Sequence, residues 1–442
     1  MILMLVSVWA IAQTGHIMQG VGAVNMSMGG AATAQPTDIS GALLWNPAAI
    51  TGFKSTVISV NAGGFFSSPE LSSTLPADIL FPGSPALSGT TKDQRGTSIM
   101  PAVSVVFGKK GSKHTIGLSA FGVSGFGVTF PEEVNNPLNP DFDPSKPSNP
   151  INYPQQAGGF GHLESDYMLM QVGFTYAYQL SDKVSFGLQP NFNYSALLLK
   201  PNPLSSPNPE NGYPVADRAS ALGYGGQVGV FFDSQTGFKL GIAYKTPQYF
   251  DNFEFTNTYL DGSDAPKNSF TMNFPGILSI GTGYSTETFD FALDFRQVFY
   301  ESTEGFSEKG WSETASVKGF GWKDMSVVSF GVQYKGFEKV PVRLGYTYST
   351  NPIKKELAFF STPATAIIKN AFQAGLGYVF SDKLTLNAVF HYGTSSGETS
   401  GQLLNPMMVS PQNPYGAIPG SSVSYTMTTS MMMFGVNYTF LK

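Results

Sequence analysis

A few basic residues set among alternating apolar ones are the side chains of this sequence best able to bind a ligand. Lys245, Arg296 and Arg343 fall at positions expected to face the interior of a β-structure. Each is a candidate partner for a carboxylate, because lysine offers a point charge and arginine a bidentate fork. Asp290 and Asp294 share the face of Arg296, so we favour the alternative that these charges form a stabilising ion-pair network.

Catalytic and metal-binding chemistry has little support in the sequence. The chain has no Cys and only four His, at positions 16, 114, 162 and 391, and none lies in a paired metal or nucleophile motif. We therefore expect no metal, no cofactor and no enzyme. A hydrolase stays open as a lesser alternative, since Ser, His and an acid could converge in space from distant positions.

These charged residues sit on strands whose pattern is inverted relative to a soluble protein. Phe289, Phe291 and Phe295 alternate with Asp290 and Asp294. This period of two is typical of a β-strand, in which successive side chains point to opposite faces. Charged residues make up 12% of the chain and aromatics 14%, whereas soluble domains carry roughly 25% charge. The pattern predicts a polar interior and a lipid-facing apolar exterior, as in an outer-membrane β-barrel.

The organisation of the chain supports one large barrel. Residues 1–12 form an apolar run ending in Ala-Ile-Ala, which we interpret as a signal peptide, truncated or with a misassigned start because no Lys or Arg precedes it; a buried first strand is the alternative. After a Gly-, Ala- and Met-rich stretch, residues 53–442 contain about fourteen predicted strands. These are 53–66, 97–108, 113–130, 166–180, 182–199, 219–233, 237–256, 268–285, 288–301, 324–336, 340–350, 367–381, 383–394 and 424–441.

The predicted connections alternate strictly between short and long. Short turns at one end and long loops at the other are characteristic of outer-membrane barrels, in which the short turns are periplasmic. The fold class expected is therefore all-β, a transmembrane antiparallel barrel with both termini on the periplasmic side. The net charge of −5 and the lack of a basic patch argue against nucleic acid as a partner.

The N-terminal stretch carries a family resemblance. Gly20–Ala23, Met28-Gly29-Gly30-Ala31 and Leu43–Ala48, with its Asn46-Pro47-Ala48 motif, resemble the N-terminal hatch of FadL-type outer-membrane transporters. Gly223–Gly229, Leu240–Pro247 and Phe434–Phe440 are similar to strands of that family. The resemblance implies a barrel plugged by a hatch, here residues 13–52, with Gly29, Gly30, Asn46, Pro47 and Ala48 as its motif residues. It also implies uptake of fatty acids or other hydrophobic compounds, released sideways at a kinked third strand.

Clustered glycines mark the predicted third strand. Gly122, Gly125 and Gly127, with Ser124 among them, would weaken the strand or produce a bulge. We expect these four residues to shape the lateral gate. The alternative is that they only accommodate the hatch or the curvature of the barrel.

The long loops are unusually apolar, which usually indicates a binding surface. We expect them to form a capture groove for a hydrophobic ligand, with flexible methionines adapting to its shape. Packing of the loops on one another to close the barrel mouth is the alternative. The capture residues expected are Leu80, Phe81, Phe359, Phe360, Leu404, Met407 and Met408.

The sequence as a whole predicts a monomer in the outer membrane of a Gram-negative bacterium, in contact with outer-membrane lipid. Its expected ligand is a hydrophobic small molecule, with long-chain fatty acids first. Uptake of aromatic hydrocarbons by the same route is the first alternative. An adhesin or structural barrel whose apolar loops bind a partner is the second.

Overall fold

The computed structural model describes residues 15–79, 82–365 and 367–440. The predicted signal peptide and the predicted capture residues Leu80 and Phe81 lie outside these ranges. Among the described helices, none is long and apolar enough to cross a membrane.

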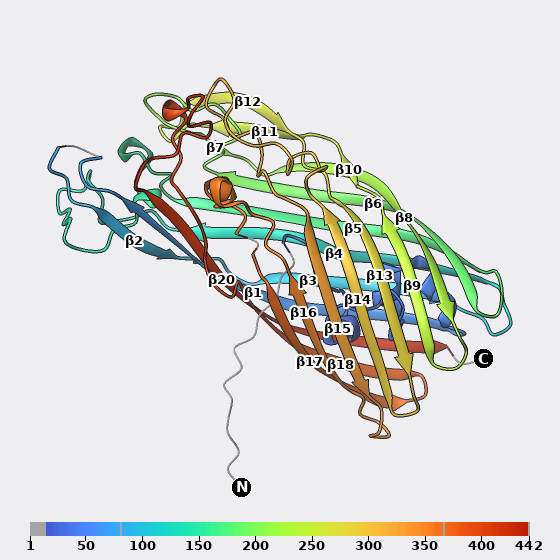
Figure 1. Ribbon diagram of the computed structural model, residues 1–442. Helices are drawn as coiled ribbons and strands as arrows, with labels where there is room; N and C mark the ends of the chain where they lie inside the picture. Colours follow the sequence, from blue (N-terminus) through green and yellow to red (C-terminus); the bar gives the residue numbers. More distant parts are fainter. Residues whose placement is uncertain (1–14, 80–81, 366, 441–442) are drawn as a thin grey trace, which may run out of the picture.

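Most of the described strands form one closed antiparallel barrel (Figure 1). Seventeen strands share its sheet, and three short ones, β2 (Leu87–Lys92), β10 (Tyr249–Phe250) and β19 (Thr399–Gly401), only extend it, which leaves a ring of fourteen. The ring closes between its first and last strands, from Thr56 opposite Phe440 to Thr74 opposite Ser422. In order, the fourteen are β1 (Thr56–Leu75), β3 (Ser98–Phe107), β4 (His114–Phe130), β5 (Leu163–Gln179), β6 (Val184–Lys200), β8 (Ala219–Asp233), β9 (Phe238–Lys245), β13 (Gly276–Ser285), β14 (Phe289–Phe299), β15 (Met325–Tyr334), β16 (Val342–Ser349), β17 (Asn370–Ser381), β18 (Leu384–Thr394) and β20 (Ser422–Phe440).

The inverted alternation predicted from the sequence is confirmed on β14. Phe289, Phe291 and Phe295 are 37%, 37% and 42% exposed, while Asp290 and Asp294 are buried. The apolar side chains therefore form the outer face, as expected for a barrel whose surroundings are hydrocarbon.

The strict alternation of short and long connections is also confirmed, but one long loop was missed. Residues 237–256 were expected to be a single strand, whereas β9 ends at Lys245, and the next wall strand begins only at Gly276. Pro247 and Pro275 flank the intervening loop, and proline cannot donate to a strand ladder. The alternating residues in between form β11 (Phe253–Thr258) and β12 (Asp264–Phe270). Strand β11 pairs with β12 on one side and with β7 (Val215–Ala216) on the other, in a small sheet outside the ring.

The remaining described elements are short helices. Five 3-10 turns occur, one in the N-terminal region and four in the long loops: η1 (Pro47–Gly52), η2 (Pro150–Asn152), η3 (Gln155–Ala157), η4 (Lys355–Ser361) and η5 (Pro406–Met408). The N-terminal region also holds α1 (Ala23–Ser27) and α2 (Ile39–Trp45).

Residues 15–52, called here the N-terminal segment, fill the interior of the ring. Helix α1 contacts β16, β17, β18 and β20, helix α2 contacts β1, β3 and β4, and η1 contacts β4, β5, β6 and β8. Figure 1 accordingly shows the blue helices enclosed by wall strands. Almost every residue of the segment is buried, so the barrel core is made largely of this segment.

Candidate functional site

The barrel wall is interrupted between β3 and β4. These strands pair only from Ala102 opposite Phe121 to Phe107 opposite Ile116. Beyond that point β4 keeps its partner β5 but has a bulge between Gly122 and Ser124. A bulge bends a strand and increases its twist. The part of β4 after Phe121, which leads to the long loop, therefore turns away from β3 and leaves an unpaired edge.

Two other parts of the chain cover the ends of this free edge. At the bulge, the N-terminal segment adds a short strand-like pairing: Gly125 N donates to His16 O at 3.0 Å, and Met18 N donates to Val123 O at 3.0 Å. At the far end, Gln94 N donates to Thr129 O at 2.8 Å. The backbone groups of β4 are thus satisfied at both ends, as burial in a membrane requires.

A cavity of about 540 Å³ opens between these two contacts. The predicted gate residues Ser124, Gly125 and Gly127 line it, whereas Gly122 is not among the lining residues. A side chain at Gly122 would instead meet Met100, Pro101 and Met170. The other lining residues include an apolar group, Met18, Phe65, Ile99, Met100 and Met168, a charged group, Arg95, Glu164, Asp166 and Arg218, and several polar residues such as Ser67, Gln94 and Thr97.

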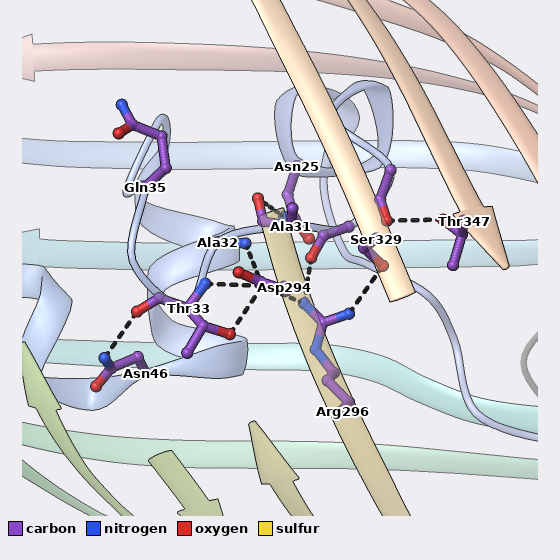
Figure 2. Close-up of polar contacts among 12 residues, drawn as sticks. Asn25, Ala31, Ala32, Thr33, Gln35, Asn46, Asp294, Arg296, Ser329 and Thr347 are labelled. Atoms are coloured by element: carbon purple, nitrogen blue, oxygen red, sulfur yellow. Dashed lines mark hydrogen bonds and ion pairs between the residues drawn. The ribbon is translucent and has the colours of Figure 1, made fainter. Parts of the chain in front are cut away.

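The N-terminal segment is held to the opposite wall by a buried ion pair (Figure 2). Asp294 Oδ2 accepts hydrogen bonds from Ala32 N at 2.9 Å, Thr33 N at 2.9 Å and Thr33 Oγ1 at 2.8 Å. Arg296 donates to the same oxygen and to Gly30 O, both at 2.7 Å. Arg296 is therefore engaged by the segment and by its own carboxylate partner.

The Asn46-Pro47-Ala48 motif makes a second attachment. Asn46 Oδ1 caps η1 by accepting from Ala48 N at 3.0 Å, and Pro47 occupies the first turn, where its missing N–H costs nothing. Asn46 Nδ2 donates to Thr33 O at 2.8 Å and to the wall carbonyl of Val230 at 3.0 Å. One amide side chain thus closes the turn and joins it to β8.

The motif glycines Gly29 and Gly30 have φ of +67° and +75°, a region that favours glycine. Gly29 O accepts from wall residue Thr347 at 2.8 Å.

Glycines of the wall itself form a cradle for the segment, a feature that sequence reasoning missed. A methyl group at Gly331 would lie 2.5 Å from Met28 O. Further Cβ atoms would overlap the segment in the same way at Gly187, Gly229, Gly241 and Gly345. Each of these five glycines faces inward from a wall strand. Glycines repeated on the lumen face of several strands were therefore the feature of the sequence that could have predicted this close packing.

The three predicted cations lie in different surroundings. Arg343 donates to Gln333 Oε1 at 2.6 Å and Asn387 Oδ1 at 3.1 Å, and it lines a 410 Å³ pocket at the short-turn end of the barrel. Lys245 donates to Gln171 Oε1 at 3.1 Å. Among the described residues, no carboxylate lies within ion-pair distance of the buried Lys245 ammonium.

An aromatic cage surrounds His16 inside the barrel, and no sequence motif indicated it. The His16 ring stacks on Phe306 at 4.7 Å between centroids, and its Nδ1 lies 2.8 Å from Tyr300 Oη. Burial lowers the pKa of His16 to about 3, so its imidazole is neutral. The other rings within about 6 Å belong to Tyr167, Phe274 and Trp322.

The predicted capture residues are partly buried. Phe359, Phe360 and Leu404 are 7%, 4% and 6% exposed, whereas Met407 and Met408 are 87% and 40% exposed. Phe359 and Phe360 pack against Phe160 and Trp311. The loops therefore pack on one another and still present methionines to the outside.

Within the described ranges, no group of three or more His, Asp or Glu side chains could hold a metal ion.

Comparisons with known proteins agree with this architecture. No curated protein sequence matches the chain. Solved structures that it resembles include a Pseudomonas aeruginosa FadL homologue, at 13% identity and TM-score 0.69 over 97% of this chain and 100% of the other. The Pseudomonas putida toluene transporter TodX follows, at 16% identity and TM-score 0.65 over 96% and 99%. The Ralstonia pickettii toluene transporter TbuX is 14% identical, with TM-score 0.61 over 96% and 99%.

The family model described as outer membrane protein transport protein (OMPP1/FadL/TodX) matches residues 152–440. Its members are not enzymes and carry hydrophobic compounds across the bacterial outer membrane. This chain belongs to the OMPP1/FadL/TodX family of outer-membrane transporters of hydrophobic compounds.

Proposed function

We propose that this protein takes up long-chain fatty acids by releasing them sideways through the break between β3 and β4. The cavity at this break carries the proposal, because a ligand there would lie between the lumen and the lipid. Its lower lining of Met18, Ile99, Met100 and Met168 suits an acyl chain, since methionine adapts to varied apolar shapes. Ser124, Gly125 and Gly127 form the rim on the β4 side.

Capture begins at the long loops. Met407 and Met408 are exposed there. The other proposed capture residues are Leu80, Phe81, Phe359, Phe360 and Leu404. From Phe360 a series of apolar side chains leads inward, because Phe360 and Phe320 line one small pocket together with Phe126. Phe320 stacks in turn on Phe306 of the aromatic cage. These side chains form a continuous apolar series from the loops to the cage, which is the proposed route of the ligand.

Inside the barrel, Lys245 is the proposed partner of the fatty-acid carboxylate. A buried ammonium without a carboxylate is poorly compensated, so a ligand anion there would supply the missing charge. Arg296 and Arg343 are less suited, because side chains and backbone of the protein already occupy them.

The N-terminal segment acts as the hatch. With residues 1–12 as the signal peptide, residues 13–52 would close the lumen to water and leave only the side exit for a ligand. The ring is closed within one chain, which favours a monomer as the working unit.

Aromatic hydrocarbons are the second candidate ligand. The cage of Tyr300, Phe306, Trp322 and Phe274 favours this reading, because flat rings pack well edge-to-face with other rings. TodX and TbuX, which this chain resembles in fold, are toluene transporters. An adhesin is less favoured, since among the described capture residues Met407 and Met408 alone are exposed, which is a small surface for a protein partner.

Uptake by proteoliposomes tests the proposal. Hexadecanoate and toluene are supplied separately to wild type, Gly125→Val and the control Ala374→Val, whose side chain is exposed on the outer face of β17. A Cβ at Gly125 would lie 3.0 Å from Tyr167 O, and a valine there would narrow the cavity. We expect hexadecanoate uptake to fall at least about tenfold in Gly125→Val only. Uptake equal to that of empty liposomes in wild type would reject the transport of both ligands.

A further inference from the structure

Three charged side chains stand together at the upper edge of the cavity in the wall. Arg95 lies in the loop before β3, Asp166 lies on β5, and Arg218 directly precedes β8. Asp166 Oδ1 accepts a short hydrogen bond from Arg95, and its Oδ2 accepts from Arg218 at 2.6 Å. All three line the cavity, and their side chains are 20%, 29% and 45% exposed, so a molecule entering the cavity reaches them.

This triad lies where the lipid-facing apolar band ends. On β5 the next outward residue below Asp166 is Met168, which is 41% exposed. On β8 the outward residues after Arg218 include Leu222 and Tyr224, which are 64% and 67% exposed. Below the triad are hydrocarbon-facing side chains, and above it β5 continues to Glu164, which pairs with Lys200, so the guanidinium groups lie at the height of lipid headgroups.

The triad carries an excess of positive charge. Arg95 and Arg218 bring two charges and Asp166 returns one, and among the described residues neither arginine has a second carboxylate within ion-pair distance. Asp93 interacts with Arg95 at longer range, and its carboxylate accepts from Thr129 N. Glu164 lies nearby but is engaged by Lys200 at 3.3 Å. Each guanidinium has five N–H donors, and its bond to Asp166 uses one, so several donors remain for another anion.

We propose that Arg95 and Arg218 form an exit site for the carboxylate of a long-chain fatty acid, which binds beside Asp166 through the N–H donors that Asp166 leaves free on these two guanidinium groups. The inference rests on the proposed sideways release. The acyl chain lies along the apolar lower lining of the cavity, and the carboxylate stays at headgroup height, which is the orientation of a fatty acid in a leaflet. Two guanidinium groups facing two carboxylates balance in charge, so the ligand anion compensates the excess positive charge without leaving Asp166 unpaired at the membrane boundary.

A pair of ligands with the same chain tests this site. Uptake of hexadecanoate and hexadecanol by proteoliposomes is compared for wild type, the double variant Arg95→Gln/Arg218→Gln, Asp166→Asn and the control Lys92→Gln. Lys92 forms an exposed ion pair with Glu70 at 3.2 Å on the neighbouring hairpin, away from the cavity lining. We expect the double variant to lower hexadecanoate uptake about tenfold and to leave hexadecanol uptake unchanged, since only the acid offers a carboxylate.

Thiol protection measures binding without transport. The chain has no cysteine, so a single Ile99→Cys on the cavity lining is labelled specifically by a maleimide. Hexadecanoate should slow this labelling more than hexadecanol does, and the double variant should abolish the difference. In Asp166→Asn, which removes the like charge beside the ligand carboxylate, protection should appear at a lower hexadecanoate concentration.

The outcomes separate the two proposals. Equal losses for acid and alcohol, or no loss for either, would overturn the exit site while leaving transport intact. A wild type that transports neither ligand, yet whose Ile99→Cys is protected by hexadecanoate through Arg95 and Arg218, would overturn the proposed function and keep the carboxylate site.

Discussion

The guanidinium carbon of Arg296 lies over the Trp45 ring, 3.7 Å from its centre, so a wall residue and a residue of the N-terminal segment make a cation–π contact inside the barrel. Lys245 Nζ lies 5.9 Å from the same ring. Arg296 is also bonded to Asp294, and Asp294 holds the backbone of Ala32 and Thr33. This cluster is the main polar attachment of the segment to β14.

Removal of Asp294 should loosen this attachment. In Asp294→Ala, Arg296 becomes a buried charge without its partner and two backbone N–H groups lose their acceptor. We expect a loss of about 3–5 kcal/mol in the free energy of unfolding, measured by urea denaturation in detergent. Asp182→Ala, in a short exposed turn, is the control and should be neutral. Equal midpoints for both variants would contradict the role assigned to Asp294.

A methyl group in the wall cradle should displace the segment. The Cβ of Gly345→Ala would overlap the amide nitrogen of Gly29, and backbone there cannot move aside cheaply. We expect about 1–3 kcal/mol of destabilisation and faster protease cleavage within residues 15–52. The matched change Gly64→Ala adds a methyl on β1 whose nearest neighbour is the side-chain carbon Thr97 Cγ2 at 3.3 Å. If both variants resist protease like wild type, the cradle tolerates more than its geometry indicates.

Fixing the N-terminal segment in the wall break should block sideways release. Ile17 and Ser124 form an isolated antiparallel bridge. The hydrogen bonds of this bridge run between neighbouring residues, from Met18 N to Val123 O and from Gly125 N to His16 O. Ile17 and Ser124 therefore face each other as a non-hydrogen-bonded pair, whose Cα spacing suits a disulfide. We expect oxidised Ile17→Cys/Ser124→Cys to lose hexadecanoate uptake and to regain it on reduction. Each single variant, treated with the same oxidant, serves as the control. Full uptake by the oxidised double variant would mean that the segment stays in place during transport.

Lys245 should distinguish acids from alcohols in the interior. Lys245→Met keeps most of the apolar stem and removes the ammonium, so we expect hexadecanoate binding to weaken about tenfold with hexadecanol binding unchanged. Arg343→Met, tested in the same titration, should bind both as wild type does, because Arg343 is occupied by Gln333 and Asn387. Unaltered hexadecanoate affinity in Lys245→Met would remove Lys245 from the route.

Acid should release His16 from its cage. Burial lowers the pKa of His16 from 6.5 to about 3. His16 inside the aromatic cage therefore binds a proton more weakly than His16 exposed to water. Its stabilising contribution is therefore complete above pH 6.5 and declines as the pH falls from 6.5 towards 3. Hydrogen exchange of residues 15–20 should accelerate over this range, and His16→Phe, which keeps a ring against Phe306, should remove the pH dependence. A profile identical in the two proteins would exclude His16 as its source.

The family fold was readable from local pattern alone. Alternation such as Phe289 to Arg296 determines which face of a strand is apolar, and the short turns and long loops determine the direction of each strand. The loop 246–275 was missed because its residues Phe253 and Phe255 alternate like a wall strand, and only pairing reveals that they lie in a separate sheet.

The site depended on contacts between distant parts of the chain. The sequence determined that Gly122 to Gly127 would weaken the third strand, because clustered glycine does so wherever it occurs. Only the tertiary structure decided that His16 and Gln94 cover the resulting edge and that Arg95, Asp166 and Arg218 meet beside it. A wall glycine such as Gly345 is likewise unremarkable until Gly29 packs on it, since close approach is a property of the pair and not of either residue.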